Sequence, residues 1–266
     1  MAAVSAPALG GGIEDGWRCA NTPDNPILAI NYCVRAIYSG DLSQDQLAAT
    51  FYNRGFEYAG RGDHDLAIKD FRAAIDLRPG FTAAYHSLAV SYMEKGEAGI
   101  AIEAVGVAID EAPGEAALYR NRAMLRLNRG EFSAALGDIE AAVKAAPDDA
   151  ENALWRFFIQ NRKGVTDTDS LTRFAVNHDL NAWPGPAIAM FIGMIEPQAI
   201  ADIGFDAADA GNWRLQCEAL FYVGQYQLML GAKANAAEFF RAAVDTGATG
   251  VMAYSGARSA LARIEG

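Results

Sequence analysis

The sequence predicts an all-α superhelical solenoid of repeated helix pairs, with an irregular helical insertion and a C-terminal capping helix. Prolines recur at a constant spacing of 34 residues, at Pro79, Pro113 and Pro147. The residues before each proline keep the same order of aromatic and small side chains, and residues 217–250 take up that order again. Self-similarity at such a period is typical of proteins in which each unit stacks on its neighbours.

Composition excludes several classes of protein. With 266 residues, 52% of them hydrophobic, the chain can bury a continuous core. Its formal net charge of -11 leaves no surplus of lysine and arginine to neutralise phosphates, so no nucleic-acid partner is expected. The apolar stretch 187–195 is about half as long as a bilayer requires, so no membrane span is expected.

Residues 1–16 are predicted to be a disordered tail or the remnant of an export signal. They lack the basic start and the long apolar stretch of an intact signal peptide, although "AVSA" and "SAPA" resemble the end of one. We favour a trimmed export signal. The alternative is a neutral tail whose small residues cannot offset the entropy of ordering it.

Residues 17–47 are predicted to form a helical lead-in to the repeats. Cys19 is placed in an irregular segment and Cys33 in a helix, so the short loop between them could close a disulfide. In the chain-entropy model such a bond contributes about 3 kcal/mol. The alternative is two ordinary buried cysteines. If the pair is bonded, Cys217 is left over as a packing residue.

Residues 48–149 are predicted to hold three repeats, each made of two helices of about a dozen residues. A small residue at the eighth position of each unit is expected to face another at the twentieth, which lets the helices approach closely. These residues are Gly55, Ala89 and Ala123, opposite Ala67, Ala101 and Ala135. Gly62, Gly96 and Gly130 fall at the turn between the helices, where a left-handed conformation is needed. The pattern closely resembles the tetratricopeptide (TPR) repeat.

The period breaks across residues 150–216, which are predicted to be a degenerate helical segment. Pro186 and Pro197 each suit the first turn of a helix, and large apolar residues between them indicate packing into the core. We therefore predict one continuous solenoid and not two domains. A fourth repeat is expected at residues 217–250 and a capping helix at 251–266.

The order of these segments resembles the NlpI-like family of bacterial envelope TPR proteins. The likeness covers about residues 48–264 and is most specific in "WPGPAIAMFIG" and "QCEALFYVGQYQLMLG". It implies a non-catalytic periplasmic adaptor, often homodimeric, that brings cell-wall hydrolases to a C-terminal processing protease. The chain shows no lipobox cysteine, so the lipid anchor of some members is not expected.

Catalytic and metal-binding patterns are missing from the sequence. There is no HExxH, CxxC, GxSxG or P-loop, and there are only three histidines. Paired aspartates such as Asp148 and Asp149 stand at turns, where carboxylates commonly start helices. The chain is therefore predicted to be no enzyme and to bind neither cofactor nor metal.

The resemblance to TPR arrays places positions five, six and nine of each unit on a concave partner-binding face. Their aromatic, amide and cationic side chains suit an apolar peptide or helix of a partner protein. The predicted partner-binding residues are Tyr52, Asn53, Phe56, His86, Val90, Arg120, Asn121, Met124, Leu154 and Phe158. Some of them, Phe158 and its neighbour Trp155 especially, could instead pack on the irregular segment. Two other functions stay open: a cytosolic scaffold that joins partners, and a homodimeric structural module whose repeat faces pair with each other.

Overall fold

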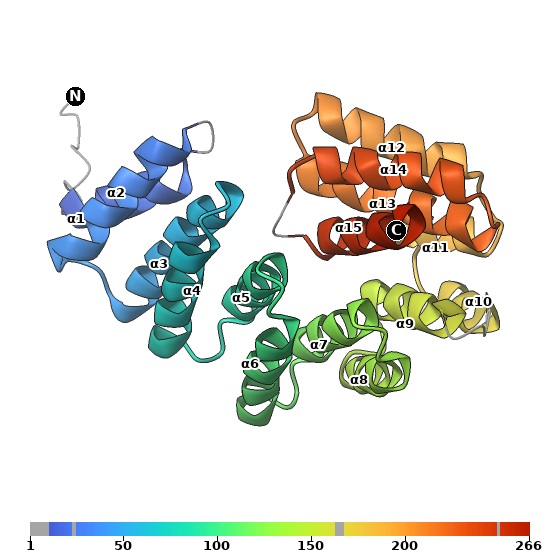
Figure 1. Cartoon of the computed structure of the whole chain (residues 1–266), viewed down its shortest axis with the longest axis horizontal. Helices are drawn as coiled ribbons and strands as arrows, with labels where there is room; N and C mark the ends of the chain where they lie inside the picture. Colours follow the sequence, from blue (N-terminus) through green and yellow to red (C-terminus); the bar gives the residue numbers. More distant parts are fainter. Residues whose placement is uncertain (1–10, 23–24, 163–167, 249–250) are drawn as a thin grey trace, which may run out of the picture. The chain divides into compact units, whose positions relative to one another are not determined.

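The computed structural model describes residues 11–22, 25–162, 168–248 and 251–266, and this part of the chain is all-α, as predicted (Figure 1). The chain divides into two compact units, residues 1–104 and 105–266. The boundary falls inside helix α6 (Ala98–Glu111), whereas the sequence predicts one continuous solenoid. The proline-rich stretch 181–197 lies well inside the second unit and is no boundary.

The first unit contains five complete helices among its described residues. They are α1 (Gly11–Ala20), α2 (Pro26–Ser39), α3 (Gln44–Gly60), α4 (His64–Leu77) and α5 (Thr82–Glu94). Helix α1 corrects the prediction of a disordered tail over residues 1–16, because residues 11–16 are helical; residues 1–10 lie outside the described part. Asp15 forms an ion pair with Arg35 of α2, and a side chain at Gly12 would collide with Ser39. Close packing on α2 therefore holds this glycine-rich segment as a helix.

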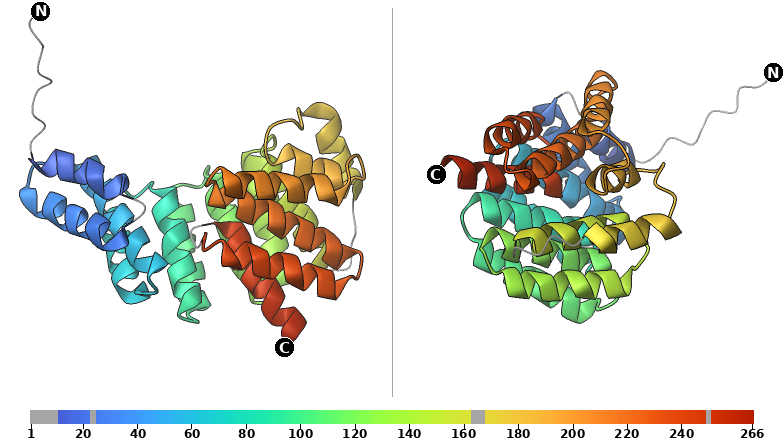
Figure 2. Two further views of the ribbon diagram at one scale, coloured as in Figure 1. Left: turned by 90° about the horizontal axis from the view of Figure 1, so that it is seen from above. Right: turned by 90° about the vertical axis from the view of Figure 1, so that its right-hand side faces the viewer.

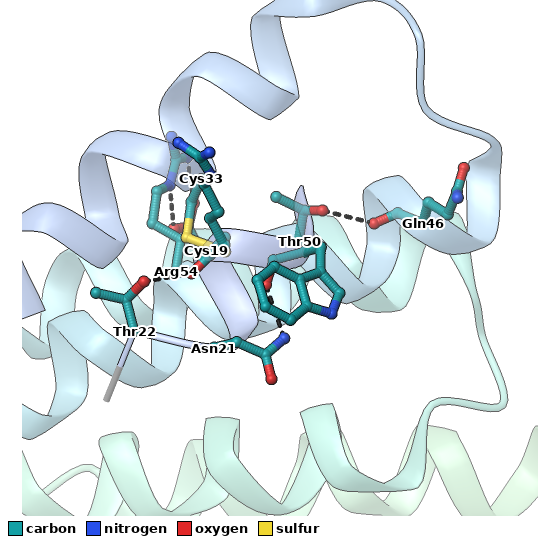
Figure 3. Close-up of a disulfide and its surroundings, with 10 residues drawn as sticks. Cys19, Asn21, Thr22, Cys33, Gln46, Thr50 and Arg54 are labelled. Carbon is teal, nitrogen blue, oxygen red and sulfur yellow. Dashed lines mark hydrogen bonds and ion pairs between the residues drawn. A yellow bond between two sulfur atoms is a disulfide. The ribbon is translucent and has the colours of Figure 1, made fainter. Parts of the chain in front are cut away.

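A disulfide joins α1 to α2. Cys19 and Cys33 are bonded, with their Cα atoms 4.9 Å apart, and both side chains are buried (Figure 3). Cys19 belongs to α1 and not to an irregular segment, which corrects the sequence-based expectation. Cys217 is free and fully buried, and burial raises the pKa of its thiol to about 12. It is a packing residue, as expected, and not a nucleophile.

Helices α3 and α4 form the first helix pair, and the pair closes on a glycine. A Cβ atom at Gly55 would lie 2.8 Å from Cε1 of Phe71, so a side chain there would collide with the ring. Asp70 receives two hydrogen bonds from Arg54 across the same seam, at 2.7 and 2.8 Å. The small residue thus makes room for an aromatic ring, where the sequence predicts a second small residue.

The second unit contains nine complete helices among its described residues. They are α7 (Ala116–Asn128), α8 (Phe132–Ala145), α9 (Ala150–Arg162), α10 (Thr168–Asn177), α11 (Gly185–Phe191), α12 (Pro197–Asp209), α13 (Trp213–Met229), α14 (Lys233–Asp245) and α15 (Met252–Glu265). Pro186 and Pro197 stand in the first turns of α11 and α12, as predicted.

The turn glycines Gly62, Gly96, Gly130 and Gly231 all have φ between 76° and 80°, the left-handed conformation that the repeats require.

Helices α12 to α15 lie side by side, as both views show (Figures 1 and 2). The α13–α14 pair repeats the seam of α3 and α4, because a Cβ atom at Gly224 would lie 2.6 Å from the ring of Phe240. Helix α15 packs on α13 and α14, and it also contacts α7. A Cβ atom at Gly256 of α15 would lie 2.8 Å from Phe221. The last helix therefore both covers the final pair and ties it to the third repeat.

We predict that Gly224→Ala destabilises the protein by roughly 1–3 kcal/mol, because the new methyl group overpacks against Phe240. Gly137→Ala is the matched control: this glycine lies in α8, is exposed, and a Cβ atom there meets nothing within 4 Å. The control should gain about 0.4–1 kcal/mol, because alanine lowers the entropy of the unfolded chain. Urea denaturation followed by circular dichroism measures both changes. Equal effects of the two variants would contradict this account of the seam.

Candidate functional site

Burial divides the predicted partner-binding residues into two groups. Val90, Asn121, Met124, Leu154 and Phe158 are each at most 5% exposed. The other five, Tyr52, Asn53, Phe56, His86 and Arg120, reach the surface at least in part. The buried group does not form an open concave face and packs in the core, and its role in contacting a partner stays a prediction.

An aromatic cluster explains why Leu154 and Phe158 are buried. The Phe158 ring lies 5.3 Å from that of Phe191 and 5.9 Å from that of Tyr222, measured between centroids. Trp155 stacks on Phe221 at 5.7 Å. The irregular segment and the fourth repeat thus fill the space beside α9, which is the alternative that the sequence left open for Trp155 and Phe158.

In the first unit, the remaining predicted residues lie mainly on α3. Phe56 is 41% exposed, and Asn53 is half-buried. Tyr52 is also half-buried, since its ring packs against Phe71 and Phe81 at 5.8 and 5.0 Å. His86 is half-buried on α5. The role of this face in binding a partner stays a prediction.

In the second unit, Arg120 lines a hollow of about 500 Å³. The hollow lies between α7, the start of α9, the end of α10 and the loop that leads into α11, and we call it the Arg120 pocket. Its basic lining residues are Arg120, Arg214 and His178. Its acidic lining residues are Asp148, Asp149, Glu151 and Asp179. Trp183 and Phe174 supply aromatic surface.

Arg120 is held in place by groups at the start of α9. Its Nη1 donates to Asp149 Oδ2 at 2.7 Å and to Asn152 Oδ1 at 2.6 Å, and its Nη2 lies 2.9 Å from Glu151 Oε2. The other oxygen of Asp149 accepts hydrogen bonds from the backbone N–H groups of residues 151 and 152. Asp149 therefore caps the helix, as its position at a turn predicts, and also orients the guanidinium.

A second part of the network comes from the loop before α11 and from α13. Trp183 Nε1 donates to Glu218 Oε2 at 2.6 Å, and Arg214 Nε donates to Glu218 Oε1 at 2.9 Å. The loop turns tightly, because a Cβ atom at Gly185 would lie 2.5 Å from the backbone of Leu180. Glycine in the "WPGP" stretch is thus required for the turn that brings Trp183 to the pocket.

The charges of the Arg120 pocket are not balanced. Burial raises the pKa of Glu151, and the neighbouring Glu218 and Asp149 raise it further, against the opposing effect of Arg120. A raised carboxyl pKa means that the site disfavours its own negative charge. An additional cation at this place would therefore be stabilised.

His178 stands at the rim of the pocket. One ring nitrogen lies 2.8 Å from the Phe174 carbonyl oxygen and the other 3.0 Å from Asp148 Oδ1. The carbonyl first, and the carboxylate second, raise the pKa of His178 above its usual value. Protonation of His178 is thus coupled to the charge at the entrance.

Arg120 is among the residues predicted from the sequence, but the residues that surround it are not. Trp183, Arg214 and Glu218 lie far from Arg120 in the chain, and only the fold brings them together. Outside this pocket, the part-buried ion pairs Arg54–Asp70 and Arg122–Asp138 have the same spacing of 16 residues in two repeats, a pattern that is visible in the sequence.

No described helix is both long enough and apolar enough to cross a membrane. The described residues also contain no group of three or more histidine, cysteine or acidic side chains placed to hold a metal ion.

Comparisons with known proteins agree with this architecture. The family model of the tetratricopeptide repeat matches residues 48–81. The crystal structure of a tetratricopeptide repeat protein from Parabacteroides merdae ATCC 43184 aligns with 96% of this chain and 98% of its own, at 17% identity and a TM-score of 0.51. MamA (41-end) from Desulfovibrio magneticus RS-1 aligns with 63% of this chain and 95% of its own, at 18% identity and a TM-score of 0.48. No curated protein matched.

The likeness to the Parabacteroides merdae protein, at 17% identity, concerns the fold alone. The described part of the chain has the all-α fold of tetratricopeptide-repeat proteins, and residues 48–81 match one such repeat.

Proposed function

We propose that the protein is a non-catalytic adaptor that binds partner proteins, and that the Arg120 pocket receives a lysine or arginine side chain of a partner. TPR proteins bind peptide or protein partners. The observation that carries the proposal is the excess of carboxylates around a hollow of about 500 Å³, a volume within the roughly 300–1,000 Å³ of typical ligand pockets.

The geometry favours a cation over an anion. Arg120 and Arg214 are already engaged by Asp149, Glu151 and Glu218, so little positive charge is left for an incoming carboxylate. Glu151, by contrast, would gain from a further cation, because burial and like charges oppose its ionisation. Trp183 and Phe174 add surface on which the aliphatic part of a basic side chain can lie.

We further propose that the protein works in the bacterial periplasm, as the resemblance to the NlpI-like family suggests. On this proposal it links a C-terminal processing protease to cell-wall hydrolases. The Cys19–Cys33 disulfide supports an exported protein, because such bonds persist mainly in oxidising compartments. The protease and hydrolase partners rest on the resemblance alone.

We predict that Asp148→Asn combined with Glu151→Gln weakens binding of basic peptides at least about tenfold, because charge-assisted hydrogen bonds contribute about 1.5–3 kcal/mol. Peptides would first be selected from a random dodecamer library displayed on phage, and their affinities measured by isothermal titration calorimetry. The selected sequences should be enriched in lysine and arginine. Glu238→Gln, an exposed neutralisation on α14, is the control and should bind like the wild type. Selection without basic enrichment, or unchanged binding by the double variant, would refute the role of the pocket.

We predict that binding of the same basic peptides strengthens as pH rises through the pKa of His178. Protonated His178 stabilises the fold through its two hydrogen bonds, and this contribution is present below its usual pKa of 6.5 and lost above the raised folded-state value. It also places a positive charge at the entrance, which repels a cation. NMR titration should give a midpoint above 6.5 for His178, lowered in Asp148→Asn. In His178→Gln the pH dependence should disappear, and its persistence would show that another group controls entry.

We predict that protein from its native cell carries one accessible thiol after acid quenching, denaturation and maleimide labelling, and three after reduction. The first label is Cys217, which is free, and reduction releases Cys19 and Cys33. Mass spectrometry counts the labels. Three labels without reduction would contradict export and favour the cytosolic scaffold.

A further inference from the structure

A second hollow, of about 250 Å³, lies along the C-terminal half of α9, between α9, α11 and α13. Its apolar lining consists of Phe157, Phe158, Phe191, Leu228 and Met229. The polar side chains at its edge are Asn161, Arg162 and Gln225. We call it the Arg162 groove.

The polar edge of this groove has no partners within the described part of the chain. Arg162 lies within ion-pair distance of no described carboxylate, and the Asn161 and Gln225 amides make no hydrogen bond with described residues. All three side chains are partly exposed. In the Arg120 pocket, by contrast, each guanidinium is paired with carboxylates.

A second guanidinium, that of Arg263, lies near Arg162, and it is not paired with a carboxylate of the described residues either. Burial lowers the pKa of Arg162, and burial together with the nearby Arg162 charge lowers the pKa of Arg263 on α15 to about 10. Arg263 Nη1 donates to the neutral Ser259 hydroxyl and not to a carboxylate. A bound anion would stabilise both cations.

We propose that the Arg162 groove binds the C-terminal end of a partner polypeptide. The last apolar side chain would lie against Leu228 and Met229, the partly exposed apolar residues of the groove, and the terminal carboxylate would pair with Arg162. The Asn161 and Gln225 amides would bond to the last peptide groups. This site is separate from the Arg120 pocket and opposite to it in charge preference, so it does not rest on the function proposed there.

The size and the amides favour a peptide over other molecules that combine a carboxylate with an apolar part. A volume of about 250 Å³ holds one or two apolar side chains and falls below the roughly 300–1,000 Å³ typical of small-molecule pockets. Beyond its carboxylate, a fatty acid carries no groups that the two amides could bind, whereas a peptide also carries backbone donors and acceptors.

Two mixtures of fluorescein-labelled random decapeptides that end in leucine test the proposal, one with a free C-terminus and one amidated. Fluorescence anisotropy should show that wild-type protein binds the free acid at least about tenfold more tightly than the amide. Arg162→Gln should remove that preference. Arg173→Gln, which removes the same charge from an exposed position on α10, should retain it.

The acid–amide comparison on wild-type protein needs no variant, so it stands even if Arg162→Gln lowers the melting temperature. Met229→Trp, which fills the hollow, should weaken binding of the free acid in a protein that keeps Arg162. Equal binding of acid and amide would overturn the proposal, as would wild-type binding by a folded Arg162→Gln. Displacement of the peptides by decanoate at equal or lower concentration would assign the groove to fatty acids. Peptides fused to phage have no free C-terminus, so this result is independent of the selection for the Arg120 pocket.

Discussion

The close approach of the two helices within each repeat is the constraint on which the rest of the structure depends. In the first and fourth repeats, glycine at the eighth position lets an aromatic ring at the twenty-fourth lie against the backbone of the first helix, and in the second and third repeats the eighth residue is alanine. Gly55 with Phe71, and Gly224 with Phe240, are the two described examples, and in both a Cβ atom would come within 2.8 Å of the ring. Such a contact fixes the separation of the two helices, because the interior is closely packed. The part-buried Arg54–Asp70 and Arg122–Asp138 pairs cross the equivalent seams and add directional hydrogen bonds to this packing.

In the second unit the same packing leads to closure instead of an open face. Helix α15 contacts α7 as well as α13 and α14, and Gly256 brings it against Phe221. The rings of Trp155, Phe158 and Phe221 then occupy the space that an open TPR array would offer to a peptide. An apolar groove with this much aromatic surface is more stable when filled, and here the chain fills it with its own residues. The hollows that a partner could enter lie instead at the two ends of α9, in the Arg120 pocket and the Arg162 groove.

Local patterns were enough to predict the repeats, and they failed where distant segments meet. The proline period, the turn glycines and the helix starts at Pro186 and Pro197 depend on neighbours within one unit, so the sequence shows them directly. Helix α1 was missed because its glycine-rich start has low helix propensity, and packing on α2 outweighs that deficit. Met124 and Leu154 were placed on the surface because a regular array was assumed, and the contacts of α11, α13 and α15 that close the second unit have no local signal. Arg120 was found as a cation, but its carboxylate partners at the start of α9 make it part of a pocket that the sequence does not reveal.

Charge along α9 can be explained in part without any ligand. Acidic residues at its start, Asp149 and Glu151, and a basic residue at its end, Arg162, suit the helix dipole, which contributes about 0.3–1 kcal/mol per charge. The dipole accounts for the sign of these charges but not for their surroundings. An exposed charge would satisfy the dipole equally well and would pay no desolvation cost, yet the pKa values of Glu151 and Arg162 are both displaced toward the neutral form, chiefly by burial. Each end of α9 therefore holds a partly buried charge beside a hollow, and ligands of opposite charge at the two ends would relieve both. Two such sites on one rigid helix would let an adaptor hold two segments of a partner, or two partners, at a fixed separation, so that binding at one end raises the effective concentration at the other.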